Sequence, residues 1–166
     1  ATFAIDLEGS VIAWNQAIEE MTGIKSSDIL GLGDYTHAVP FYGERRPILL
    51  DLVLKEDIEY EKKYPLIIRK EQNLISEIFI PLLYNGNGAY LWFIASPLYD
   101  MKGRVVGAIE SIRDITERKK VEMALVASEQ QYRNVVEDQK EFICRFSPNG
   151  THVFVNDEYC RYFSRK

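Results

Sequence analysis

Residues 107–118 carry the chain from a β-strand into a helix, and they read Gly107-Ala108-Ile109-Glu110-Ser111-Ile112-Arg113-Asp114-Ile115-Thr116-Glu117-Arg118. Within a strand predicted over 105–113, Ala108 and Ile112 fall on one face because strand side chains alternate. Asp114 and Thr116 follow, and their short polar side chains can accept hydrogen bonds from unpaired backbone N–H groups at a helix start. We therefore expect these two residues to join the last strand of a sheet to an outgoing helix.

Two more strands precede this one and form a hairpin. The segment from Ile75 to Leu83 alternates loosely between apolar and polar residues, and the segment from Ala89 to Leu98 is rich in aromatic and branched side chains, which favour strands. Tyr84-Asn85-Gly86-Asn87-Gly88 separates the two segments, and Asn and Gly tolerate the positive φ angles of tight turns. The second half of the chain therefore predicts three antiparallel strands.

The chain begins with another hairpin. Phe3 to Leu7 and Ser10 to Trp14 are short apolar runs joined at Gly9, a residue that suits a tight turn. Asn15 is placed to cap a helix, and Gly23 is placed to end it.

Two further helices are expected before the second hairpin. One is a short turn that begins at Ser26, and the other is buried and runs from Pro47, a typical first helical residue, to Leu54. The order of elements predicts an α+β fold with a five-stranded antiparallel sheet, helices across one face, and a long C-terminal helix.

Residues 142–163 repeat the outline of residues 3–22. With Gly150 set on Gly9, the matched pairs are Ile5 with Phe146, Ile12 with Val153, Trp14 with Val155, Asn15 with Asn156 and Ile18 with Tyr159. A repeated domain indicates a modular array. We expect a first domain over 1–116, a linker helix over 117–141 and the truncated start of a second domain over 142–166, with chance similarity of a short pattern as the alternative.

The linker segment carries a narrow apolar stripe. It contains no Gly or Pro from Glu117 to Lys140, and a seven-residue frame aligns Val121, Leu125, Tyr132 and Val135, with Arg118 and Ser128 in the same rows. A lone helix with so thin a stripe is marginal in water, so we expect it to pair as a coiled coil with the same segment of a second chain. The alternative is a solvated linker helix.

The composition excludes several classes of function. A net charge of −5 and a pI near 5.2 argue against a nucleic-acid surface. Cys144 and Cys160 have no metal-binding spacing, which suits a reducing cytoplasm. No apolar run reaches membrane-spanning length, although the start at Ala1 leaves room for a membrane anchor upstream in a longer parent. In the absence of a nucleophile motif, a phosphate loop or a metal-binding helix, we expect no catalytic or metal site in this segment.

Arg45 and Arg46 are the strongest candidates for ligand binding. They precede a predicted helix start, where backbone N–H groups favour an anion, and a guanidinium can hold a carboxylate with two hydrogen bonds. The expected ligand is a small anionic metabolite, and the other expected contacts are Trp14, Tyr35, Tyr42, Phe93 and Ile109. The alternative is that both arginines pair with Glu44 or Asp51 at the surface.

Several local motifs resemble those of the PAS sensory domain. They read Ile5-Asp6-Leu7-Glu8-Gly9, Val11-Ile12-Ala13-Trp14-Asn15-Gln16-Ala17, Met21-Thr22-Gly23 and, most specifically, Asp114-Ile115-Thr116-Glu117-Arg118. The resemblance covers residues 2–118 and resumes at about 142–163. It implies that Asp114 and Thr116 transmit a signal from the sheet to the outgoing helix. The segment from Ala38 to Pro47 resembles PAS modules of archaeal methanogen histidine kinases.

The resemblance implies a sensory input module of a cytoplasmic signalling protein, most simply a histidine kinase of a two-component phosphorelay. The kinase or further PAS domains would lie elsewhere in the parent chain. Some PAS modules hold haem through a histidine, but His37 lies ahead of the helix that carries this ligand, and light-sensing flavin modules need a pocket cysteine, which this first module lacks. We therefore expect neither haem nor flavin. The alternative function is a ligand-free module for dimerisation and spacing.

Overall fold

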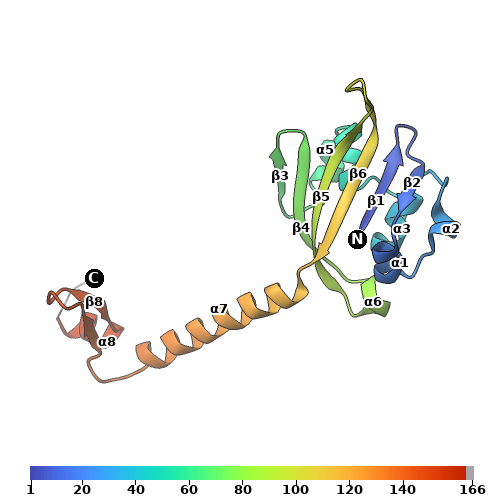
Figure 1. Ribbon diagram of the computed structural model, residues 1–166. Coiled ribbons are helices and arrows are strands. Elements are labelled where there is room, and N and C mark those ends of the chain that lie inside the picture. Colours follow the sequence, from blue (N-terminus) through green and yellow to red (C-terminus); the bar gives the residue numbers. More distant parts are fainter. Residues whose placement is uncertain (164–166) are drawn as a thin grey trace. The chain divides into compact units, whose positions relative to one another are not determined.

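The computed structural model describes residues 1–163 and divides the chain into two compact units (Figure 1). The first unit is Ala1–Thr116, and the second begins at Glu117. Each unit has its own antiparallel sheet.

The first unit is built on one sheet with the strand order β2-β1-β6-β5-β4-β3. Its strands are β1 (Thr2–Asp6), β2 (Val11–Trp14), β3 (Ile67–Lys70), β4 (Asn73–Ile80), β5 (Ala89–Tyr99) and β6 (Val105–Asp114). In Figure 1 this sheet faces the viewer, with α3 and α5 behind it. The predicted α+β class is confirmed, with six strands in place of the expected five.

The additional strand, β3, pairs with β4 at the edge of the sheet. Glu71 adopts the left-handed backbone conformation, with φ of 56°, and Lys70 faces Asn73 across a tight turn. The sequence Ile67-Ile68-Arg69-Lys70 ends in two charged residues and lacks the apolar alternation by which a strand is recognised, and the pattern therefore did not predict it. Charged side chains are typical of exposed edge strands.

Short helices connect β2 to β3 and β4 to β5. They are α1 (Gln16–Thr22), α2 (Ser26–Ile29), η1 (Thr36–Ala38), α3 (Val39–Tyr42), α4 (Leu49–Leu54), α5 (Ile58–Glu61) and α6 (Leu83–Gly86). Both predicted ends of α1 are confirmed, because Asn15 Oδ1 accepts a hydrogen bond from the Ile18 N–H and Gly23 adopts φ of 76°. The central helix α4 packs against β4, β5 and β6.

The predicted helix start at Pro47 is wrong by two residues. Ile48 is extended, with φ of −124° and ψ of −177°, and α4 begins at Leu49. The Asp51 carboxylate accepts a hydrogen bond from the Ile48 N–H at 2.9 Å, so an acidic side chain reaching back from the first turn holds this helix end. The segment before it contains two short helices, η1 and α3, which the sequence pattern did not predict.

The sheet face that packs against the helices is buried. On the two central strands its side chains are Leu91, Phe93, Ala95, Ala108, Glu110 and Ile112. Ile109 alternates with Ala108 and Glu110 and lies on the opposite face, so its predicted place under the ligand is wrong. Glu110 places a carboxyl group in an otherwise apolar row.

The second unit consists of a long helix followed by a small hairpin and a short helix. The elements are α7 (Thr116–Glu137), whose first residue closes the first unit, β7 (Cys144–Phe146), β8 (His152–Val155) and α8 (Asp157–Tyr162). Every side chain of α7 is at least partly exposed. Within residues 1–163, no helix combines the length and the apolar character needed to cross a membrane.

The hairpin β7–β8 reproduces β1–β2 residue by residue at a spacing of 141 residues. The pairs Phe3↔Trp14, Ala4↔Ala13 and Ile5↔Val11 recur as Cys144↔Val155, Arg145↔Phe154 and Phe146↔His152, and both hairpins shift register after the second pair. Gly9 and Gly150 have φ of 84° and 83°. The two segments therefore share one backbone conformation as well as one sequence outline.

Candidate functional site

Arg46 is buried although it carries a charge, with 9% of its surface exposed. It lies just before α4, and its guanidinium carbon Cζ is 3.7 Å from the centre of the Tyr42 ring on α3, which is a cation–π contact. Its Nε has no hydrogen-bond partner among the residues that the structure describes. Two of the predicted ligand residues, Arg46 and Tyr42, thus meet inside the fold.

The Tyr42 hydroxyl extends this contact to Tyr64, from the segment before β3. The two hydroxyl oxygens are 3.5 Å apart, and the Tyr64 oxygen also accepts a hydrogen bond from the Leu49 N–H at 2.9 Å. Burial raises the pKa of both phenols, so both remain neutral.

Glu110 approaches the same region from β6 and is 1% exposed. Burial is the main cause that raises the pKa of its carboxyl group to about 8, the Asp51 carboxylate adds to the effect, and a hydrogen bond from the Leu50 N–H opposes it. The second carboxyl oxygen, Oε2, has no partner among the described residues. At neutral pH, Glu110 is therefore largely protonated.

His37 and Asp51 form a buried pair beside Glu110. The His37 ring is fully buried, its Nε2 lies 3.0 Å from Asp51 Oδ2, and its Nδ1 has no partner in the described part of the chain. The ring also lies 5.8 Å from that of Phe3, the residue opposite Glu110 in the sheet register. Asp51 thus connects the start of α4 to the histidine.

These polar residues form what we call the core polar cluster. Its members are His37, Tyr42, Arg46, Asp51, Tyr64 and Glu110. Three of its buried atoms lack a partner within residues 1–163, although buried polar atoms in proteins are almost always hydrogen-bonded. The cluster therefore offers unused hydrogen-bonding groups to a small polar molecule or to ordered water.

The other predicted ligand residues lie elsewhere or are already engaged. Arg45 is exposed and pairs with Asp34 at the surface. Tyr35 is 39% exposed, and its ring is 6.3 Å from that of His37. Trp14 packs on Phe3 and donates its indole N–H to the Ile24 carbonyl at 3.1 Å. Phe93 lies on the buried sheet face, with its ring 6.4 Å from that of Phe41.

Sequence reasoning missed Glu110, although a signal was present. Its position lies between Ala108 and Ile112 in a row predicted to face the core, so strand alternation alone places the carboxyl group inside. Tyr64 stands in a polar segment without periodicity and gave no such signal.

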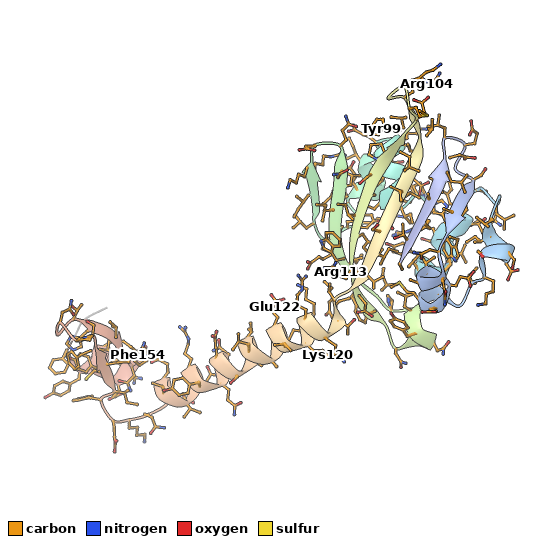
Figure 2. The ribbon with its side chains drawn as sticks, viewed as in Figure 1. Tyr99, Arg104, Arg113, Lys120, Glu122 and Phe154 are labelled. Atoms are coloured by element: carbon orange, nitrogen blue, oxygen red, sulfur yellow. The ribbon has the colours of Figure 1, made fainter. Side chains whose placement is uncertain are left out.

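A hollow of about 240 Å³ has Asp51, a member of the core polar cluster, in its wall. Its charged wall residues are the acidic Glu8, Asp34 and Asp51 and the basic Lys55, and the others are Ile5, Leu7, Gly9, Tyr35 and Leu54. A larger hollow, of about 620 Å³, opens beside the last residues of β6, where Met21, Trp92 and Arg113 line it with Asp114. Figure 2 shows Arg113 where β6 approaches α7.

The junction between β6 and α7 is bonded to β5 through Tyr90. The Ile115 N–H donates to the Tyr90 carbonyl at 2.9 Å, and the Tyr90 N–H donates to Thr116 Oγ1 at 3.0 Å. Asp114 Oδ1 accepts the Thr116 N–H at 2.8 Å, and burial together with a hydrogen bond to Asp114 raises the pKa of Tyr84. Both predicted junction residues therefore form hydrogen bonds at the end of the first unit, and Thr116 is bonded to β5.

The four predicted dimer residues on α7 are all exposed. The exposed fractions are 69% for Val121, 59% for Leu125, 74% for Tyr132 and 55% for Val135. Lys120 and Glu122 also project from this helix in Figure 2, and they form ion pairs with Glu117 and Lys119.

Residues 1–120 match a protein family described as the PAS fold. The chain belongs to the PAS family. The matching region covers the first unit and the first residues of α7. No curated protein matches the chain.

Solved PAS structures resemble the chain at low sequence identity. The PAS domain of BvgS from Bordetella pertussis is 17% identical with a TM-score of 0.46, and the match covers 76% of this chain and 83% of that domain. An RNA-binding light-oxygen-voltage receptor is 19% identical with a TM-score of 0.52, over 81% of this chain and 34% of the receptor. The PAS domain of the histidine kinase ThkA is 19% identical with a TM-score of 0.39, and the match covers 69% of this chain and 97% of that domain. At such identities the likeness is one of fold.

Proposed function

We propose that this PAS domain is the sensory input module of a larger signalling protein and that it binds a small anionic molecule at Arg46. The observation that carries the proposal is a buried guanidinium with no carboxylate partner among the described residues. A buried charge without a counter-charge is costly, and an anionic ligand would supply the missing partner. Arg45 would contribute only if its surface pair with Asp34 opened.

The signal would pass from the core to α7 through the β6 junction. Arg46 precedes α4, which packs on β5 and β6, and Tyr90 of β5 is bonded to Ile115 and Thr116. A ligand that favours one arrangement of α4 on the sheet would shift the population of junction geometries. Coupling energies of this kind are typically about 1–3 kcal/mol.

The output would be carried by a dimer. The exposed apolar residues of α7 support pairing with the same helix of a second chain as a coiled coil. The parent favoured by the sequence resemblance is a cytoplasmic sensor histidine kinase, with the kinase or further PAS domains downstream in the same chain. We further propose that residues 142–163 are the first hairpin and helix of a second PAS module, since they repeat the register of β1–β2.

A second candidate is a ligand-free module that dimerises and spaces other domains. The close burial of Arg46 against Tyr42 favours it, because the guanidinium already has an aromatic partner.

Mass measurement of the purified chain under native and denaturing conditions separates these candidates. A sensor retains a small molecule that disappears in Arg46→Ala and persists in the control Arg104→Ala, which changes a surface residue paired with Asp100 at the β5–β6 turn. The sensor proposal is wrong if Arg46→Ala retains the same molecule, or if the unliganded chain shows no thermal shift with a panel of small carboxylates.

A further inference from the structure

The core polar cluster contains a guanidinium and a carboxyl group that each have a buried atom without a hydrogen-bond partner among the described residues. Arg46 Nε is a donor without a partner, and Glu110 Oε2 is a carboxyl oxygen without a partner, both within the described residues. The proposed function uses only the first of these groups. A ligand that satisfied Arg46 alone would leave the Glu110 oxygen buried and unpaired, at the usual cost of an unmatched polar group.

We propose that the ligand is a small zwitterion of the amino-acid type, with its carboxylate at Arg46 and its ammonium group at Glu110. This inference rests on the proposed function and specifies the class of molecule that the same site selects. A carboxylate accepts hydrogen bonds from a guanidinium, and an ammonium group donates to a carboxyl oxygen. One compact molecule then pairs both groups.

Arg46 and Glu110 have the same two tyrosines, Tyr42 and Tyr64, as neighbours. Burial is the main cause that raises the pKa of Tyr42 and Tyr64, the Glu110 carboxyl group adds to the rise, and the Arg46 guanidinium opposes it. Tyr42 touches Arg46 directly, and its hydroxyl reaches Tyr64. Tyr64 accepts the Leu49 N–H, and Glu110 accepts the next N–H along the chain, that of Leu50, so the chain of polar side chains from Arg46 and the acid meet at the start of α4.

The surroundings of Glu110 favour a cationic group. Asp51 lies close enough to raise the pKa of Glu110, and it forms part of the 240 Å³ hollow that Glu8 and Asp34 also line. The wall of this hollow carries three carboxylates against one ammonium group, that of Lys55, so its charges favour a cation next to Asp51. Binding of the ammonium group would stabilise the ionised form of Glu110.

The test uses the full chain and the twenty standard L-amino acids as probes in thermal-shift and calorimetric titrations. Each amino acid that binds is compared with the matched acid that lacks the amine and with the matched amine that lacks the carboxylate, such as propionate and ethylammonium for L-alanine. We expect both analogues to bind at least tenfold more weakly. Glu110→Gln and Arg46→Lys should each weaken amino-acid binding by a similar factor, while Arg104→Ala should not.

The possible results distinguish this inference from the proposed function. If acids without an amine bind as tightly as the amino acids, the zwitterion proposal is wrong and the anion proposal stands. If neither class of probe binds, both proposals are wrong. Glu110→Gln is nearly isosteric, and its melting curve shows whether a loss of binding reflects unfolding. Unchanged amino-acid binding in a folded Glu110→Gln protein would also overturn the inference.

Discussion

Asn15 and Asn156 occupy the same position, 141 residues apart, in two copies of one hydrogen-bond pattern. Asn15 Oδ1 accepts the N–H groups of Thr2 and Ile18, each at 3.1 Å. Asn156 Oδ1 accepts those of Ile143 and Tyr159, at 3.1 and 3.2 Å. In each copy one side chain caps the helix and also accepts a hydrogen bond from the backbone at the start of the hairpin's first strand.

Removing the cap of α1 should therefore destabilise the first unit. Asn15→Ala loses an N-cap, worth about 1 kcal/mol, and also leaves the Thr2 N–H without its acceptor. Asn15→Asp keeps the acceptor and serves as the matched control. Chemical unfolding followed by tryptophan fluorescence measures the change, since Trp14 and Trp92 both lie in the first unit. Equal stability of the alanine and aspartate variants would contradict the role of the cap.

Glu110 should make the free energy of unfolding fall as pH rises from about 5 to 8. Its pKa is about 8 in the folded protein, against a usual 4.5, so the unfolded chain gains by ionising while the folded chain does not. Each pKa unit corresponds to about 1.4 kcal/mol. The free energy of unfolding is therefore highest below the pKa of Glu110 in the unfolded chain, and it falls as the pH approaches the pKa of Glu110 in the folded protein.

The measurement is urea unfolding across this pH range for the native chain and for Glu110→Gln. The difference isolates Glu110, because His37, Tyr42, Arg46, Asp51 and Tyr64 face the same cluster in both proteins. We expect the slope to be smaller in the variant. The same slope in both would show that Glu110 does not titrate in this window.

Thr116→Val should loosen the joint between the sheet and α7. The substitution keeps the side-chain shape and removes the acceptor of the Tyr90 N–H, a hydrogen bond worth about 1 kcal/mol. We expect faster hydrogen exchange at Tyr90 and in the first turn of α7. Thr116→Ser retains the hydroxyl and should exchange at close to the native rate. If both variants exchange alike, the hydroxyl does not hold the junction.

Charges on the predicted stripe of α7 should dissociate the proposed dimer. Leu125→Glu combined with Val121→Glu would place like charges at the centre of a paired seam. Sedimentation of the chain should then report a monomer. Met123→Glu adds a charge on another face of the same helix and should leave the dimer intact. A dimer that survives the double substitution would place the interface outside α7.

Local patterns predicted the elements whose signals are contained in a few neighbouring residues. Asn15, Gly9 and Gly23 report their own backbone conformation, and those predictions were confirmed. The strand predicted to reach Leu83 ends at Ile80, and the short helix α6 lies in the connection where a tight turn was expected. The start of α4 was misplaced because a carboxylate three residues onward, Asp51, determines it. The residues of the core polar cluster come from η1, α3, α4, β6 and the segments before α4 and β3, and their meeting is a property of the tertiary fold. Arg46 and Tyr42 were predicted as ligand contacts, and strand alternation could also have placed Glu110 in the core.

The hydrogen bond from the Tyr90 N–H to Thr116 Oγ1 connects β5 to the β6 junction. Thr116 is the first residue of α7 and also provides the acceptor for a strand N–H of β5. Turning the helix about its own axis carries Oγ1 around that axis and away from the Tyr90 N–H. Leaning the helix about the Thr116 end leaves the acceptor in place. We therefore predict that this hydrogen bond opposes rotation of α7 about its own axis more than it opposes a change in the inclination of α7.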